Sequence, residues 1–146
     1  MLKIPPPIWA FLYLALGGAV STAYPWHPIV TPAPLGIALI ATGFTISFLS
    51  VWLFLRRGAQ LNPASETHTT LVVNGPFRFT RNPMYLGLVV LTLGLAFWVG
   101  SPPMFAVPFL VFATTNWVHI PYEEARMRQN FGEAYDAYRT KTRRWL

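Results

Sequence analysis

The sequence predicts an all-α integral membrane protein, a bundle of four transmembrane helices followed by a pair of amphipathic helices at the cytoplasmic surface. Of its 146 residues, 53% are hydrophobic and 11% are charged, whereas soluble domains carry about 25% charged residues. The charged residues are also segregated, because four long apolar runs contain none of them. The length suits a single domain covering residues 1–146.

The four apolar runs define the expected spans, which are residues 8–24, 35–55, 84–100 and 104–120. A helix needs about 20 apolar residues to cross the hydrocarbon core, with a lower limit near 17, and each run is long enough. Helices buried in a soluble bundle would keep a polar face. These runs show almost none, so we expect them to lie in a bilayer.

The distribution of charge predicts the orientation. With four spans both termini lie on one side of the membrane, and every Lys and Arg falls on that side, while the connections 25–34 and 101–103 contain none. The positive-inside rule makes that side cytoplasmic. Topology and contact with anionic membrane lipids then account for the net charge of +6 without a nucleic-acid partner. The compact four-span form suggests a bacterial inner membrane.

The first apolar run has two interpretations. Lys3, the run itself and the small residues Ala19, Ser21 and Ala23 match a cleaved signal peptide. The proline triplet of residues 5–7 is unusual for such a peptide, and we favour a retained first helix.

Two segments lie outside the expected spans. Residues 56–83 form a cytoplasmic loop whose length is typical of functional loops. Residues 121–146 predict amphipathic helices, because Pro121 suits a first helical turn and Gly132 is expected to bend the segment. One apolar stripe recurs there at helical spacing, formed by Met127, Phe131, Tyr135 and Tyr138. A basic amphipathic segment of this kind lies in the membrane interface.

The start of the third span is read either as a plain helix cap beside a positive-inside arginine, which the segment alone favours, or as an anion site. Asn82 is expected to cap the helix through its side chain, and Pro83 suits the first helical position. The free N–H groups and the helix dipole attract an anion there, and Arg81 adds a positive charge. Tyr85 in the first turn would pack on a ligand or on lipid headgroups.

The tandem carboxylates Glu123 and Glu124 open the segment after the fourth span, where the helix dipole stabilises negative charge. Arg126 and Arg128 stand at favourable helical spacings from them. Because neighbouring residues point in different directions around a helix, one carboxylate can pair with an arginine while the other faces a ligand. An ammonium at that carboxylate and a carboxylate at the Arg81 site together fit the methionine end of S-adenosylmethionine.

His119 sits one residue inside the end of the fourth span. It is read either as a packed residue or as a proton acceptor or substrate contact, and we place it on the substrate side. His27 and His68 are too far away in the chain to share a metal with it, and there is no Cys, so no metal site is expected.

These residues resemble the integral membrane isoprenylcysteine carboxyl methyltransferases and their phospholipid methyltransferase relatives. The resemblance covers roughly residues 62–146. It rests on an ordered set of short motifs, namely Thr70-Leu71-Val72, Gly75-Pro76, Arg81-x-Pro83-x-Tyr85-x-Gly87, Glu123-Glu124, and Phe131-Gly132 followed by Tyr135 and Tyr138.

The resemblance implies a cytoplasmic site for S-adenosylmethionine and a lipid substrate that enters from the bilayer. Carried over by motif, the cofactor contacts are Thr69, Thr70, Leu71, Val72, Phe77, Asn82, Pro83, Met84, Tyr85 and Glu123. Arg81 and Glu124 complete the expected cofactor site, and His119 and Glu123 are the candidate catalytic residues.

Three positions depart from the eukaryotic isoprenylcysteine pattern. Asn82 replaces a His and Phe77 replaces a Tyr, changes that leave a capping residue and an aromatic ring in place. His119 stands where those enzymes have an Arg that handles the substrate, so the resemblance leaves the substrate open.

The favoured function is methyl transfer from S-adenosylmethionine to a lipophilic carboxylate or thiol. The alternatives are N-methylation of a phospholipid amine and a non-catalytic membrane scaffold. Gly87 and Gly94 lie seven residues apart on one helix face and permit close helix contact. That contact lies either within the chain or between the chains of a homo-oligomer.

Overall fold

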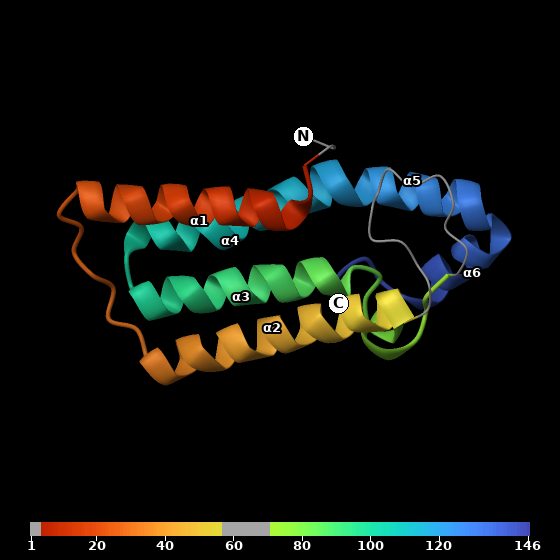
Figure 1. Cartoon of the computed structure of the whole chain (residues 1–146), viewed down its shortest axis with the longest axis horizontal. Coiled ribbons are helices and arrows are strands. Elements are labelled where there is room, and N and C mark those ends of the chain that lie inside the picture. The colour runs from red at the N-terminus through yellow and green to blue at the C-terminus, as the bar shows by residue number, and fades with distance from the viewer. Residues whose placement is uncertain (1–3, 57–70) are drawn as a thin grey trace.

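The computed structural model describes residues 4–56 and 71–146, and within these ranges it contains helices and no strand (Figure 1). A 3₁₀ turn, η1, covers Gly75–Arg78, and a π-helical turn, η2, covers Thr115–His119. The α-helices are α1 (Pro6–Ala23), α2 (Ala33–Arg56), α3 (Pro83–Val99), α4 (Pro102–Thr114), α5 (Ile120–Phe131) and α6 (Glu133–Lys141).

The long helices lie side by side, with α2 against α3, α3 against α4, and α4 against α1. Figure 1 shows α1 and α2 at opposite edges of this arrangement, and α5 and α6 together at one end of it. As the short connection between them predicts, α3 and α4 are antiparallel neighbours. Buried side chains from three helices fill the contact between α1, α3 and α4, namely Ala10, Ala96, Met104, Val107 and Val111.

Glycines bring α2 and α3 into direct backbone contact. Gly36 and Gly43 of α2 are buried against α3, and Gly87 and Gly94 of α3 are buried against α2. A Cβ placed on Gly94 would lie 2.6 Å from the backbone nitrogen of Ile40, so no larger residue fits there without displacing α2. The close contact expected at Gly87 and Gly94 is therefore made within the chain, between two helices that both lead to the pocket described below.

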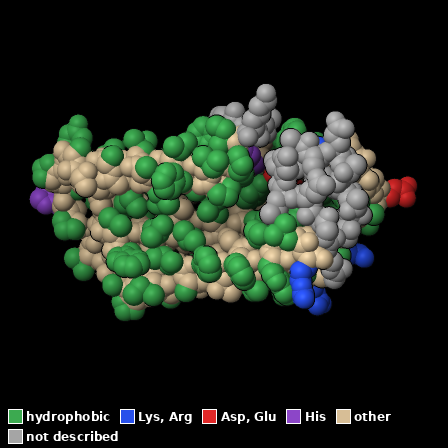
Figure 2. Space-filling model, in the orientation of Figure 1, with side chains coloured by type: hydrophobic (Ala, Val, Ile, Leu, Met, Phe, Trp, Pro, Cys, Tyr) green, Lys and Arg blue, Asp and Glu red, His purple; other side chains and the backbone are tan. Residues whose placement is uncertain are grey.

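The length and surface of the helices indicate a membrane protein. Three helices are long and apolar enough to cross a membrane, namely α1, α2 and the continuous helix Pro102–Phe131, while α3 is a shorter apolar helix. Large apolar side chains point outward along them, and Phe11 and Phe109 are 70% and 72% exposed. Figure 2 shows this apolar surface extending over the length of the bundle. Lipid tails would cover such side chains.

The end of the fourth apolar run differs from the expectation. A separate helix was expected to start at Pro121, but α4, η2 and α5 form one continuous helix. Proline normally disrupts a helix, because it lacks an N–H and its ring clashes with the carbonyl four residues earlier. The turn just before Pro121 is π-helical, with the Ile120 N–H bonded to the carbonyl of Thr115, and this wider turn accommodates the proline.

Two further expectations concern the segments outside the apolar runs. Gly132 breaks the helix between α5 and α6 with a positive φ of 49°, as expected. Of the loop 56–83, residues 57–70 lie outside the described residues, so Thr69 and Thr70 are not placed. Leu71 to Asn74 lead without regular structure into η1.

Substitution of Gly94 tests the close helix contact. Gly94→Ala is expected to lower the thermal unfolding midpoint in detergent, because the added Cβ pushes against the α2 backbone and overpacking costs about 1–3 kcal/mol. Gly18→Ala is the matched control, since nothing lies within 4 Å of a Cβ at Gly18. Equal midpoints for the two variants would contradict the contact.

Candidate functional site

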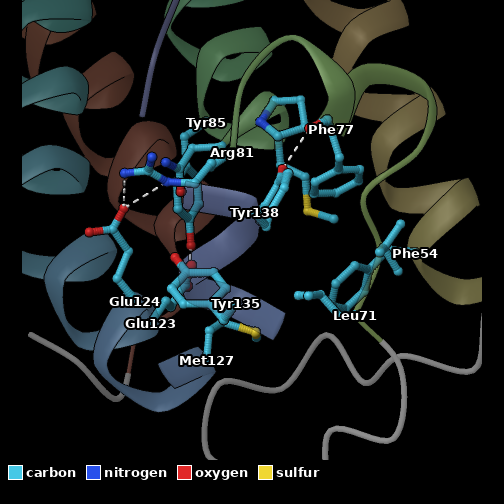
Figure 3. Close-up of a pocket in the computed structure, with 14 residues that line it drawn as sticks. Phe54, Leu71, Phe77, Arg81, Tyr85, Glu123, Glu124, Met127, Tyr135 and Tyr138 are labelled. Carbon is cyan, nitrogen blue, oxygen red and sulfur yellow. Dashed lines mark hydrogen bonds and ion pairs between the residues drawn. The ribbon is translucent and has the colours of Figure 1, made fainter. Parts of the chain in front are cut away.

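A pocket lies at the end of the bundle where α2 ends and α3 begins, beneath α5 and α6 (Figure 3). The structure brings ten of the predicted site residues to its wall, which are Leu71, Val72, Phe77, Arg81, Asn82, Pro83, Met84, Tyr85, Glu123 and Glu124. Segments far apart in the sequence thus meet in one place.

Asn82 occupies the N-cap position of α3 but makes no side-chain cap hydrogen bond. Instead its Nδ2 donates to the backbone carbonyl of Arg144, at 2.9 Å. The expected cap is therefore wrong, because the segment after α6 folds back and offers Asn82 a different partner. The first backbone N–H groups of a helix have no partner within the helix. Since Pro83 has no N–H, the N–H groups left without a side-chain cap at the start of α3 are those of Met84 and Tyr85.

Arg81 and Glu124 form a partly enclosed ion pair. Arg81 Nη2 lies 2.7 Å from Glu124 Oε1, and the two side chains are only 10% and 12% exposed. Arg144 Nη2 lies 2.6 Å from the other oxygen of Glu124. The remaining Arg81 donor, Nη1, reaches the backbone carbonyls of Arg139 and Thr142. All three nitrogens of the Arg81 guanidinium thus already donate to protein oxygens.

The ion pairs that helical spacing predicted for Glu123 and Glu124 with the following arginines do not form, and the arginines have other partners. Arg128 was matched with Glu124 by spacing, but it lies 2.8 Å from Asp136 of α6. Arg126 was matched with Glu123, but its guanidinium lies over the ring of Tyr122 at 5.7 Å. The break at Gly132 turns α6 back toward α5, which brings Asp136 within reach of Arg128.

Glu123 has a different environment from its neighbour. It lines the pocket and accepts a hydrogen bond from the hydroxyl of Tyr85. Among residues 4–56 and 71–146, no Lys or Arg forms an ion pair with it. A carboxylate taken from water without a cation is costly. The arrangement therefore suits a ligand that brings a positive charge, beside helix N–H groups that suit a negative one.

His119 lies outside the pocket wall. The residue is 3% exposed, and within residues 4–56 and 71–146 its Nε2 has no hydrogen-bond partner. It precedes Glu123 by four residues in the continuous helix, so it lies one helical turn from Glu123 toward the interior of the bundle. The helix also contacts α1 there, where the hydroxyls of Tyr13 and Thr114 lie 2.8 Å apart.

Sequence reasoning did not assign four of the residues that line the pocket, Phe54, Met127, Tyr135 and Tyr138. The last three were recognised as an apolar helical stripe, but the stripe was expected to face the membrane interface. The Tyr138 hydroxyl donates to the carbonyl of Phe77 at 2.6 Å. Burial raises the pKa of Tyr138, and burial together with the charge of Glu124 raises the pKa of Tyr135 to about 12. Both hydroxyls are therefore donors at neutral pH.

The comparison with protein families is decisive for the class of protein. The model of the family described as phospholipid methyltransferase matches residues 33–134, which is more than half of the chain. The chain belongs to the phospholipid methyltransferase family. The matched range runs from the start of α2 into α6 and includes most of the pocket wall.

Three relatives share part of this family sequence. An uncharacterized protein of Haemophilus influenzae is 32% identical over 63 residues, which are 43% of this chain and all of that protein. Protein-S-isoprenylcysteine O-methyltransferases B and A of Arabidopsis thaliana are 31% and 34% identical over 77 residues. Those residues are 50% of this chain and 37% of each Arabidopsis protein. No solved structure matches the chain.

Removal of the Arg81 charge tests the ion pair. Arg81→Met is expected to destabilise the protein by about 1.5–3 kcal/mol, because it removes charged hydrogen bonds to the enclosed Glu124, which keeps Arg144 as its cation. Chemical unfolding in detergent measures the change. Arg128→Met is the matched control, since the Arg128–Asp136 pair is exposed and exposed pairs contribute little. A loss of stability no greater than that of the control would contradict the assignment.

Proposed function

We propose that this protein transfers a methyl group from S-adenosylmethionine to a lipophilic acceptor at the cytoplasmic membrane face. The observation that carries the proposal is the carboxylate of Glu123, which faces the pocket without a cationic partner among the described residues. It lies beside the start of α3, whose first N–H groups have no side-chain cap. Membership of a methyltransferase family supports the same activity.

The two ends of the cofactor's amino-acid group match these two features. Glu123 would hold the ammonium, with its carboxylate kept in place by the hydroxyl of Tyr85. The N–H groups of Met84 and Tyr85 would hold the carboxylate, because a helix N-terminus favours an anion. Thr69 and Thr70 stay predicted contacts, since they lie outside the described residues.

Arg81 and Glu124 would act as positioning residues for this site. The guanidinium nitrogens of Arg81 and both oxygens of Glu124 already have protein partners, which leaves neither as a strong partner for the cofactor. Aromatic and sulfur-containing side chains supply most of the remaining pocket wall and would enclose the adenosine, namely Phe54, Phe77, Met84, Met127, Tyr135 and Tyr138.

The bound cofactor supplies an electrophilic methyl group on a positively charged sulfur. The acceptor's lone pair forms the new bond to that methyl carbon while the carbon–sulfur bond breaks, and its electron pair goes to sulfur. The neutral thioether that leaves needs no acid. The protein therefore contributes by holding the two reactants in line and by excluding water with the apolar wall of the pocket.

His119 would contact the acceptor. It lies one turn from Glu123 toward the bundle interior, and its buried Nε2 has no hydrogen-bond partner among the residues that the structure describes. A buried polar atom without a hydrogen-bond partner is unfavourable, and a polar group of the methyl acceptor would supply that partner. A carboxylate or thiolate acceptor is already a nucleophile and needs no base, whereas an amine must first lose a proton, which His119 would accept.

The alternative acceptor is the amine of a phospholipid, which the description of the matching family favours. The Arabidopsis relatives are described as acting on protein S-isoprenylcysteine, which favours a carboxylate. Incubation of membranes with methyl-labelled cofactor separates the two, because label in phospholipid headgroups supports the amine and base-labile label in a methyl ester supports the carboxylate.

The proposed site also implies a topology. Four spans, with α3 as the short third span, would place the pocket and both termini in the cytoplasm, where the positive charges gather. A bacterial inner membrane is the expected location. The lipophilic acceptor would then reach the pocket from the bilayer.

Neutralising Glu123 tests the cofactor site. Glu123→Gln is expected to weaken binding of S-adenosylmethionine by at least tenfold, because the ammonium then meets an uncharged amide in place of a carboxylate. Calorimetric titration of the detergent-purified protein measures the change. Glu133→Gln, an exposed glutamate of α6, is the matched control. Normal affinity in Glu123→Gln would refute the assignment, and a folded wild type that binds no cofactor would favour a non-catalytic scaffold.

Substitution of His119 tests the acceptor side. His119→Ala is expected to raise the KM for the acceptor severalfold while the Kd for S-adenosylmethionine is unchanged, because His119 lies outside the cofactor pocket. The labelled-methyl assay at varied acceptor concentration gives KM, and calorimetry gives Kd. The role is wrong if the KM stays at the wild-type value, or if both constants rise together.

A further inference from the structure

The segment after α6, residues 142–146, folds back across the start of α3, and we call it the strap. The backbone carbonyl of Arg143 accepts a hydrogen bond from the N–H of Arg81 at 2.9 Å. The next carbonyl, that of Arg144, accepts from Thr80 Oγ1 and from Asn82 Nδ2, both at 2.9 Å. The strap therefore contacts three consecutive residues at the point where α3 begins.

We propose that the strap keeps the first turn of α3 open for an anionic ligand by drawing the side chain of Asn82 away from it. Asparagine is among the strongest helix-capping residues. Asn82 occupies the N-cap position, but its φ of −126° and ψ of 53° differ from the extended backbone that a capping residue normally adopts. Its amide is bonded to the Arg144 carbonyl and not to the helix, so the strap holds Asn82 away from the capping conformation. Without the strap, this side chain would cap α3 and compete with a ligand for the same N–H groups.

Arg144 links the strap to the carboxylate pair as well. Its guanidinium holds one oxygen of Glu124 at 2.6 Å, and Arg81 holds the other. With both oxygens of Glu124 engaged, α5 is held against the start of α3 at this point. Glu123 is the adjacent residue on the same helix, so the same contacts fix the direction in which it points. The strap thus positions both the start of α3 and Glu123, the two parts of the proposed site.

Trp145 anchors the strap on the π-helical turn. Its Nε1 donates to Oδ1 of Asn116 at 3.0 Å, and its ring lies 4.9 Å from that of Phe112. This anchor lies outside the pocket wall. Trp145 is therefore a positioning residue that acts on the start of α3 through Arg143 and Arg144.

Amide hydrogen exchange in the ligand-free protein tests this inference directly. Trp145→Phe keeps an aromatic ring and loses the bond to Asn116, and we expect it to loosen the strap so that Asn82 can turn and cap α3. Exchange at the N–H groups of Met84 and Tyr85 is expected to slow by about fivefold, the effect of one typical cap. A strap that only stabilised the fold would give the opposite result, because its loosening would speed exchange there.

Two further variants complete the experiment. Trp117→Phe is the matched control, since Trp117 also packs on Phe112 but is 68% exposed, and its exchange rates should equal those of the wild type. Adding Asn82→Ala to Trp145→Phe removes the competing cap and should restore fast exchange. Unchanged or faster exchange in Trp145→Phe, or no recovery in the double variant, would overturn the inference.

The consequence for the ligand rests on the proposed cofactor site and has its own measurement. Trp145→Phe is expected to weaken binding of S-adenosylmethionine by about fivefold through the same competition, while the circular dichroism of the helices is unchanged. Slowed exchange without weaker binding would uphold the action of the strap and refute the cofactor's contact with α3. A wild type that binds no cofactor would refute the proposed function alone.

Discussion

The carboxylate of Glu124 is the point on which the site depends. It lies between Arg81, at the start of α3, and Arg144, in the segment after α6. These residues come from distant parts of the chain, and their contacts join the start of α3 to α5 beyond the apolar contacts between the long helices. Enclosed ion pairs are only weak evidence of stability. Here the more direct consequence is geometric, since the pair fixes α5 against α3.

The neighbouring carboxylates then divide their roles. Glu124 is neutralised by protein cations, whereas Glu123 faces the pocket with a tyrosine hydroxyl as its partner. Two adjacent acidic residues on a helix point in different directions, so one residue can hold the structure while the next is kept for a ligand. In a member of the phospholipid methyltransferase family, a positively charged ligand at Glu123 is the chemically reasonable occupant.

Much of the fold follows from sequence patterns that act locally. Apolar runs, the glycine spacing on α3 and the break at Gly132 depend on neighbours in the chain, and the structure has the corresponding helices, contact and break. Most of the expected pocket residues also meet, because the motifs mark the helix ends that face one another. Contacts made by the segment after α6 were not predictable in this way. Helical spacing alone could not show that Arg144 reaches Glu124 or that it draws Asn82 from the helix.

The central claim is that the charge of Glu123 binds the ammonium of the cofactor. The most direct measurement compares S-adenosylhomocysteine with an analogue that lacks only its amino group, on the wild type and on Glu123→Gln, by calorimetry. The account predicts that removing the amino group greatly weakens binding to the wild type and hardly changes binding to Glu123→Gln, because the two changes remove the same interaction. An equal loss of affinity in both proteins would contradict the account, since the ammonium would then be bound elsewhere.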